Sequence, residues 1–285
     1  MDGRAKAPGA GTILNALATG TGSAFAIDLY TTASVSLGDD DAITGSIAER
    51  PDGDTHLIET CVKMTLETFG DGVATGGEVY TESEVPLAAG LKSSSAAANA
   101  TVLATLDALE KSEDVDRIEA TKLGVAAARR AGVTVTGAFD DASASMLGGV
   151  TLTDNTEDRL LAHDHFDAAV AIHTPPEEAF TVDADVDRCT RLSPIADLVA
   201  ELAESGRYGT AMTVNGLAFS AALDHTTEPT MQALPDVRGV SLSGTGPSTV
   251  AIGETAAIER VADTWGDQPG TVRTTRTQQD GAVVL

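Results

Sequence analysis

Residues 86–98 read PLAAGLKSSSAAA, so a proline and a glycine turn stand directly before a long alanine-rich run. This order predicts the end of a strand, a tight turn at Gly90 and a helix that begins near Ser93. A helix start leaves backbone N–H groups unpaired and carries a partial positive charge, and both features suit a phosphate group. Lys92 adds a full charge at the same place. Two interpretations fit the stretch equally: a phosphate-binding loop, or an ordinary helix start capped by its serines.

The charge of the chain restricts its partners. The formal net charge is −25, and the acidic residues are spread along the whole length of the 285-residue chain. Such a surface repels nucleic acid and anionic lipid, so we expect neither as a partner. Dispersed acid with little lysine also suits a cytoplasm very rich in salt, because salt screens the self-repulsion, and this predicts a halophilic source.

The remaining global features are those of a soluble protein. Two cysteines, Cys61 and Cys189, are too few for a disulfide framework or a metal cluster. No signal segment opens the chain and no apolar run reaches about 18 residues. We therefore expect a cytoplasmic protein, either a monomer or a homodimer.

Hydrophobic periodicity predicts an α+β protein in two parts. The clearest element is a long half-buried strand in which apolar residues alternate from Phe25 to Leu37. The glycine-rich residues 3–21 are expected to form a short strand followed by loops or a helical turn. A change of composition at residues 155–164 predicts a division into residues 1–158 and 159–285. The other expected strands are residues 77–85, 133–139, 150–153, 168–173, 238–242, 248–252 and 271–277, and the expected helices are residues 56–69, 93–109, 114–131, 193–205, 208–225 and 255–265.

Two further stretches carry groups that could take part in chemistry. Residues 243–248 read SGTGPS, in which Gly244 and Gly246 can adopt positive φ and turn backbone N–H groups toward a ligand. An ordinary hairpin turn would have the same composition. Asp140 and Asp141 follow an apolar stretch and precede an Ala/Ser helix. Acids at that place commonly cap a helix, and at the end of a strand they also serve as a base or a metal ligand.

Three motifs, taken together, resemble the kinase superfamily named after galactose, homoserine, mevalonate and phosphomevalonate kinases, the GHMP kinases. Its P-x-x-x-G-L-G-S-S-A-A pattern appears as residues 86–96, its early A-P-G as residues 7–9 and its late S-G-T/S-G turn as residues 243–246. Within the superfamily the chain is most similar to the archaeal shikimate kinases. Residues 11–16, 18–25, 90–95 and 137–142 carry that similarity.

The resemblance implies a fold and a reaction. The fold has an N-terminal ATP-binding α/β part like a ribosomal-protein domain and a C-terminal ferredoxin-like part, with the active site between them. The reaction moves the γ-phosphoryl of ATP to the 3-hydroxyl of shikimate and gives 3-phosphoshikimate and ADP for aromatic amino-acid biosynthesis. Such kinases use Mg²⁺.

The resemblance also implies roles for individual residues. Lys92 would counter charge on the β- and γ-phosphates, and Ser94 would face magnesium. Asp140 would orient or deprotonate the acceptor hydroxyl, with Asp141 as the backup base or a metal ligand. The implied ATP-binding residues are Pro86, Leu87, Ala88, Ala89, Gly90, Leu91, Lys92, Ser93, Ser94, Ser95 and Ala96. The implied substrate-binding residues are Thr12, Asn15, Ser23, Asp140, Gly244, Thr245 and Gly246.

The chain departs from the superfamily pattern at three places. Ala10 stands where relatives often carry lysine after A-P-G, and Lys92 replaces a glycine of the central motif. We expect Lys92 to supply the charge that is missing at position 10. Arg129 and Arg130 stand where many relatives place a magnesium-binding glutamate.

Two other functions fit the same motifs. A kinase of another small alcohol, of the homoserine or mevalonate type, would carry the same phosphate-binding residues. A non-catalytic ligand-binding regulator could also use this fold, but the intact acids at positions 140 and 141 argue against it.

Overall fold

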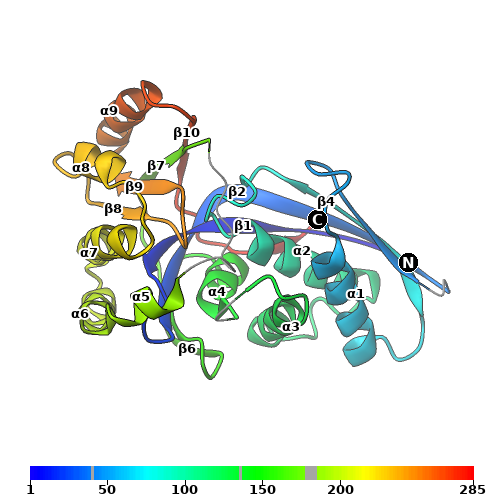
Figure 1. The fold of residues 1–285 in the computed structure, drawn as a ribbon. Helices are drawn as coiled ribbons and strands as arrows, with labels where there is room; N and C mark the ends of the chain where they lie inside the picture. Colours follow the sequence, from blue (N-terminus) through cyan, green and yellow to red (C-terminus); the bar gives the residue numbers. More distant parts are fainter. Residues whose placement is uncertain (40–41, 135–136, 177–184) are drawn as a thin grey trace.

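Two sheets organise the protein in the computed structural model, which describes residues 1–39, 42–134, 137–176 and 185–285 (Figure 1). The larger sheet follows the path β11-β1-β2-β4-β3, with β5 paired to β2 and β6 paired to β5. The smaller sheet has the order β10-β7-β9-β8 and is antiparallel throughout. The strands are β1 (Asp2–Leu14), β2 (Thr21–Gly38), β3 (Ile43–Ile47), β4 (Gly76–Ser83), β5 (Val150–Asp154), β6 (Arg159–Asp164), β7 (Ala169–Thr174), β8 (Gly239–Leu242), β9 (Thr249–Gly253), β10 (Thr271–Arg276) and β11 (Val283–Val284).

The long strand β2 pairs with two different strands along one of its edges. Its second half pairs with β4 and its first half pairs with β5, while β1 runs antiparallel along most of its length. Ala33, Val35 and Leu37 are buried on one face, as the alternation predicts, and the serines between them are more exposed. β2 therefore joins the two ends of the larger sheet.

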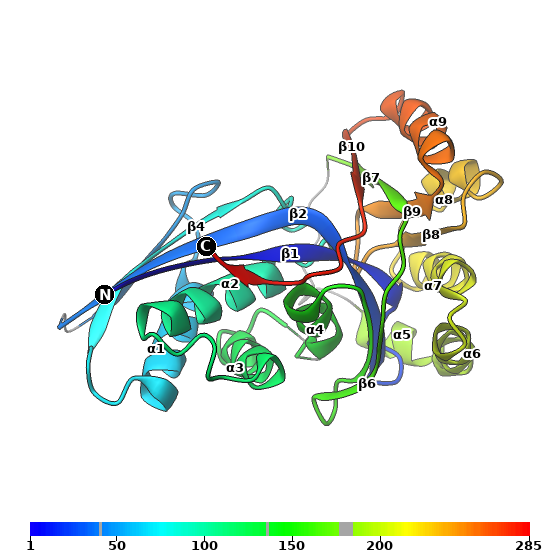
Figure 2. The ribbon, with the colours of Figure 1, turned by 180° about the vertical axis from the view of Figure 1, so that it is seen from behind.

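One face of the larger sheet is covered by α1 (His56–Phe69), α2 (Ser93–Ala108) and α4 (Phe139–Leu147), and α3 (Arg117–Arg130) packs on the outside of these helices, as Figures 1 and 2 show. The central helix α2 is buried along almost its whole length, because small residues let it lie directly on β1. A Cβ on Gly3 of β1 would lie 2.1 Å from the carbonyl oxygen of Ala104 in α2. The alanines and Gly3 thus fix how closely this helix approaches the sheet.

The smaller sheet is buried on both faces. Val170, Ile172, Val250 and Ile252 face α6 (Ser193–Glu204) and α7 (Tyr208–Ala222), and this core also includes Phe25 of β2. On the other face, α9 (Thr255–Gly266) places Trp265 against the sheet near α8 (Glu228–Ala233). A short helix, α5 (Val186–Thr190), completes the described elements.

Most predicted elements are confirmed, with shifts of a few residues at their ends. The prediction for residues 3–21 is right in its order, a strand followed by turns, but the predicted strand is too short, since residues 2–14 form the single strand β1 and the turns occupy only residues 16–20. The glycines of β1 serve close packing rather than turns: a Cβ on Gly11 would lie 2.5 Å from the Phe25 ring. The predicted strand at residues 133–139 is wrong for its described residues, because α4 already begins at Phe139. Residues 135–136 lie outside the described chain.

Five elements have no counterpart in the sequence-based prediction: β3, β6, β11, α5 and α8. β6 lies in the polar segment where a change of composition suggested a domain boundary, and it pairs with β5 in the larger sheet. The chain crosses to the smaller sheet after β6, and the division at residues 158 and 159 stays a prediction. No described helix combines the length and apolarity needed to cross a membrane.

Candidate active site

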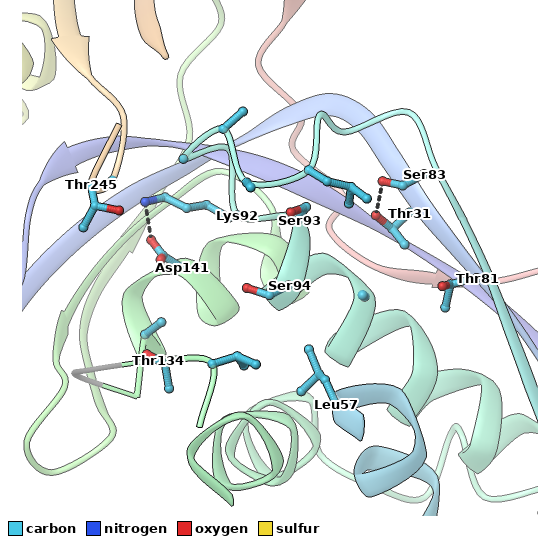
Figure 3. Close-up of a pocket in the computed structure, with 18 of the residues that line it drawn as sticks. Thr31, Leu57, Thr81, Ser83, Lys92, Ser93, Ser94, Thr134, Asp141 and Thr245 are labelled. Atoms are coloured by element: carbon cyan, nitrogen blue, oxygen red, sulfur yellow. Dashed lines mark hydrogen bonds and ion pairs between the residues drawn. The ribbon is translucent and has the colours of Figure 1, made fainter. Parts of the chain in front are cut away.

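A cavity of about 370 Å³ lies where α2, α4 and two glycine-containing loops meet (Figure 3). At one end it is lined by Thr12, Lys92, Asp140, Asp141 and Thr245. The other end lies between β2, β3, β4 and α1, and its lining there includes Thr31, Ile47, Leu57, Ile58 and Thr81. The cavity thus has one end lined by Lys92, Asp140 and Asp141, and a second end where apolar side chains lie beside Glu49, Arg50 and Asp54.

The loop before α2 has the left-handed backbone that a tight turn requires. Gly90 has a φ of 77° and Lys92, the N-cap residue, a φ of 66°. No side chain of the described chain caps this helix start, so the predicted serine caps do not form. Ser93 and Ser94 instead line the cavity in the first turn of α2. The helix start therefore keeps its polar groups available to a ligand.

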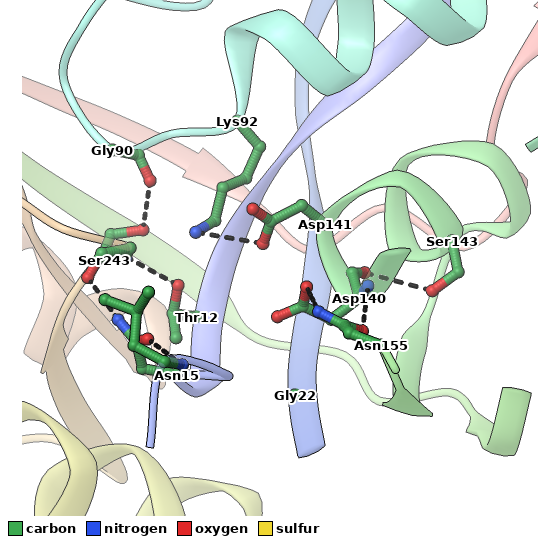
Figure 4. Close-up of polar contacts among 12 residues, drawn as sticks. Thr12, Asn15, Gly22, Gly90, Lys92, Asp140, Asp141, Ser143, Asn155 and Ser243 are labelled. Atoms are coloured by element: carbon green, nitrogen blue, oxygen red, sulfur yellow. Dashed lines mark hydrogen bonds and ion pairs between the residues drawn. The ribbon is translucent and has the colours of Figure 1, made fainter. Parts of the chain in front are cut away.

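The two glycine loops are packed against each other. A Cβ on Gly90 would lie 2.1 Å from the carbonyl oxygen of Ser243, and the Ser243 hydroxyl donates to the Gly90 carbonyl at 2.9 Å. The Gly244 N–H donates to Thr12 Oγ1 at 2.8 Å, and Asn15 Nδ2 donates to the Gly244 carbonyl at 2.9 Å (Figure 4). The second loop is therefore held by both β1 and the loop before α2.

Lys92 reaches from the start of α2 to the start of α4. Its Nζ lies 3.0 Å from Asp141 Oδ1, and the two side chains are only 7% and 18% exposed. A Cβ on Gly244 would lie 2.7 Å from the same Nζ, so the glycine leaves room for the ammonium group. The ion pair places one positive and one negative charge at the cavity wall.

Asp140 is the most perturbed carboxyl group of the site. It is 5% exposed. Burial, and next the charge of Asp141, raise its pKa to about 7, against the opposing effects of Lys92 and a hydrogen bond from Asn155. That hydrogen bond runs from Asn155 Nδ2 to Asp140 Oδ1 at 2.7 Å. A buried carboxyl with a pKa near neutrality is typical of a proton-transfer residue.

Sequence comparisons connect this geometry to known enzymes. The family model for the GHMP kinases N terminal domain matches residues 56–149. The shikimate kinase of Halobacterium salinarum is 62% identical over 283 residues, which cover 99% of both chains. The chain belongs to the archaeal shikimate kinase family. The shikimate kinase of Methanosarcina mazei is 48% identical, over 99% of this chain and 97% of that protein.

Solved structures confirm the GHMP kinase fold. The homoserine kinase of Cytophaga hutchinsonii aligns with a TM-score of 0.76 at 17% identity, over 100% of this chain and 97% of that one. The mevalonate kinase of Methanococcus jannaschii aligns with a TM-score of 0.76 at 14% identity, over 96% and 98%. At these identities the likeness concerns the fold alone.

Most of the residues that the family resemblance implies come together in the cavity. Those that line it are Thr12, Asn15, Leu87, Ala88, Ala89, Gly90, Lys92, Ser93, Ser94, Asp140, Asp141, Gly244 and Thr245. The others lie outside the lining as described: Pro86, Leu91, Ser95, Ala96, Ser23 and Gly246. Leu91 and Ala96 belong to the apolar cores. The Ser23 hydroxyl is buried and donates to the Thr151 carbonyl at 2.8 Å, which disfavours its predicted contact with substrate.

Two residues near Asp140 were not found from the sequence. Asn155 binds the Asp140 carboxylate. Gly22 lies so close that a Cβ on it would be 2.3 Å from Asp140 Oδ2. Gly22 stands in a motif of the family resemblance, but Asn155 lies in a polar segment without any distinguishing pattern. Arg129, in the helix before the acids, pairs with Asp158 and does not line the cavity as described.

Proposed function

We propose that this chain is a shikimate kinase, which transfers the γ-phosphoryl of ATP to the 3-hydroxyl of shikimate and releases 3-phosphoshikimate and ADP. The observation that carries the proposal is the meeting of a buried carboxyl, Asp140, with a lysine at an uncapped helix start in one cavity. The full-length relatives with the name shikimate kinase support the choice of acceptor.

The end of the cavity lined by Lys92 suits the triphosphate. The first turn of α2 offers backbone N–H groups and a positive dipole end, and Lys92 adds an ammonium group beside them. Phosphoryl transfer depends mainly on positioning and on neutralising the charge of the phosphates. We therefore place the β- and γ-phosphates at the first turn of α2, beside the ammonium group of Lys92.

The donors at this place fit a magnesium ion bound together with the nucleotide. Mg²⁺ commonly takes one or two protein oxygens and completes its shell with phosphate oxygens and water. The Ser94 hydroxyl lines the cavity at the first turn of α2 and would hold the ion. When bound, Mg²⁺ neutralises charge on the phosphates. Among the described residues there is no group of three or more acids, histidines or cysteines that could hold a metal alone.

The end of the cavity near α1 suits the nucleoside. Ile47, Leu57 and Ile58 supply apolar surface for a flat base, and Thr31 and Thr81 supply hydroxyl groups beside it. Small-molecule sites typically combine apolar surface with a few polar groups, and Glu49, Arg50 and Asp54 supply further polar groups at this end. This assignment leaves the end near Thr12 and Thr245 for the acceptor.

Asp140 acts on the acceptor hydroxyl in this proposal. The carboxylate takes the hydroxyl proton while the oxygen forms its bond to the γ-phosphorus and the bond to the ADP oxygen breaks. With a pKa near 7, Asp140 is partly ionised at neutral pH and able to accept that proton. Thr12 and Asn15 both hold the Gly244 peptide, so they also shape the acceptor end.

A coupled assay of ADP release with a panel of alcohols tests the acceptor. We expect turnover with shikimate and at least about a hundredfold lower kcat/KM with homoserine or mevalonate, because a site built for several hydroxyls rejects acceptors that lack them. Preference for homoserine or mevalonate would make the chain a sister kinase. ATP binding without turnover of any alcohol would make it a regulator.

We also propose the wider setting implied by the sequence. ATP binding falls mainly to residues 1–158, and residues 159–285 contribute the Gly244 loop. The acidic chain works in the cytoplasm of a halophile, with shikimate, ATP and Mg²⁺ as its small-molecule partners and neither nucleic acid nor membrane among its partners.

A further inference from the structure

Asn155 contacts Asp140 at two points. Its Nδ2 donates to Asp140 Oδ1 at 2.7 Å, and its Oδ1 accepts from the backbone N–H of Asp140 at 3.0 Å (Figure 4). The residue is 2% exposed and lies outside the cavity lining. Asn155 therefore reaches the carboxylate from the protein interior rather than from the ligand side.

The orientation of the Asn155 amide follows from the groups that donate to it. The Asp140 N–H and the Thr153 hydroxyl both point at Asn155 Oδ1, at 3.0 and 2.7 Å. A backbone N–H can only donate, so the amide atom that faces it must be the oxygen. The NH₂ group of Asn155 consequently faces the carboxylate of Asp140.

This orientation makes the two oxygens of Asp140 different. Because an NH₂ group only donates, Asp140 Oδ1 stays an acceptor whether the carboxyl is charged or neutral. A proton taken up by Asp140 therefore goes to Oδ2. Oδ2 can occupy its position only because residue 22 is glycine. A Cβ at residue 22 would lie 2.3 Å from Asp140 Oδ2.

We propose that Asn155 is a positioning residue that holds Oδ1 of Asp140 and so presents Oδ2 as the atom that takes the proton of the acceptor hydroxyl. Thr153 acts one step further away, since its hydroxyl helps to fix the amide. The inference rests on the proposed function, because it takes Asp140 to be the base.

The test compares Asn155→Ala with a matched control, Thr151→Val. The Thr151 hydroxyl is also buried beside Asp140, but it contacts the Asp140 carbonyl at 3.3 Å and Ser143 at 2.9 Å instead of the carboxylate. For Asn155→Ala we expect kcat to fall at least about tenfold, with KM for ATP and for shikimate within about twofold. For Thr151→Val we expect kcat within about twofold of the parent enzyme.

Two results would overturn the proposal: a raised KM with unchanged kcat in Asn155→Ala, or an equal fall of kcat in Thr151→Val. Should Asn155→Ala not fold, the near-isosteric Thr153→Val takes its place. Its kcat should fall about threefold relative to Thr151→Val, and equal kcat values in the two would refute the inference.

Asp140→Asn separates a failure of this inference from a failure of the proposed function. An active Asp140→Asn enzyme removes the assignment of Asp140 as the base. An inactive Asp140→Asn enzyme beside a fully active Asn155→Ala enzyme removes only the role of Asn155.

Discussion

Lys92 Nζ and Asp141 Oδ1 lie 3.0 Å apart, although one residue occupies the N-cap position of α2 and the other belongs to the first turn of α4. An acid near a helix start is favourable, whereas a lysine there is not, because the dipole is positive at that end. The carboxylate of Asp141 therefore offsets the unfavourable interaction between the Lys92 ammonium group and the positive end of the α2 dipole. A bound triphosphate would share this role, which makes the pair a natural target for mutation.

Replacing Lys92 with methionine should weaken both folding and nucleotide use. Asp141 would lose its partner in a mostly buried place, so we expect a loss of about 2–4 kcal/mol in the free energy of unfolding, measured with urea. The kcat/KM for ATP should fall about a hundredfold, because a cation at the phosphates is lost.

The control for this variant is Lys63→Met on the outside of α1. Lys63 faces Glu67 at 4.0 Å and both side chains are more than half exposed, so its removal should cost less than about 0.5 kcal/mol. Unchanged ATP kinetics in Lys92→Met would show that the phosphates lie elsewhere.

Asp140→Asn should lower kcat by about a thousandfold and leave KM for ATP nearly unchanged. The substitution keeps the shape of the side chain but removes its ability to take a proton. Steady-state kinetics on both substrates measures the effect. Asp141→Asn is the comparison: a greater loss of kcat there than in Asp140→Asn would transfer the role of base to Asp141.

The titration of Asp140 should change both the activity and the stability of the protein with pH. Because its pKa is raised to about 7, kcat should rise as the pH passes through that region and the carboxylate forms. The folded protein holds this proton to a higher pH than the unfolded chain, whose aspartates titrate near pH 3.9. Between these two values the folded state binds more protons, so the free energy of unfolding contributed by this group falls as the pH rises.

Asp140→Asn lacks this titration. The variant should therefore melt at a higher temperature than the parent protein at pH 8, and the difference should shrink as the pH approaches 4. Thermal unfolding followed by circular dichroism at several pH values measures it. A parent protein that stays the more stable of the two at pH 8 would contradict the raised pKa.

Gly22→Ala should impair catalysis although residue 22 carries no reactive group. Its Cβ would meet Asp140 Oδ2 at 2.3 Å, so the carboxylate must move, and we expect kcat to fall at least about tenfold. Gly266→Ala serves as the control, since an added Cβ at residue 266 meets nothing within 4 Å. Kinetics in which both variants match the parent enzyme would mean that the position of Oδ2 is unimportant.

Stability should depend strongly on salt. With a net charge of −25, the folded chain repels itself when the ionic strength is low, and molar salt reduces the screening length to about 3 Å. We expect the melting temperature to rise by at least about 10 °C between 0.1 and 3 M KCl. A melting temperature indifferent to KCl would remove the prediction of a halophilic source.

Sequence patterns predicted the elements that have a regular period. The alternation in β2 follows directly from which face is buried, so this strand was found. The position of α2 was found from the glycine turn and the alanine-rich run, because the helix is buried almost all round rather than along one stripe. The full length of β1 was missed because glycine was interpreted as a turn signal, whereas Gly3 and Gly11 serve close packing against α2 and Phe25. A single sequence does not distinguish these two uses of glycine.

The site residues that belong to short sequence motifs could be predicted. The residues whose role depends on a contact between distant parts of the chain could not. Lys92, Asp140 and Thr245 all belong to short patterns. The role of Asn155 depends on a hydrogen bond to a residue 15 positions away, formed only when the strand after α4 turns back beside it. The pairing of Lys92 with Asp141 likewise depends on how two helices meet.

The core that contains Phe25 of the larger sheet and Val170 of the smaller one has a consequence for engineering. Cutting the chain between the sheets would expose apolar surface on both fragments, so neither half is expected to remain soluble by itself. Exchanging residues 159–285 with those of another kinase would succeed only if the donor segment also matched the shape of β1 and β2. Acceptor specificity is thus better altered by changing the cavity wall than by exchanging halves.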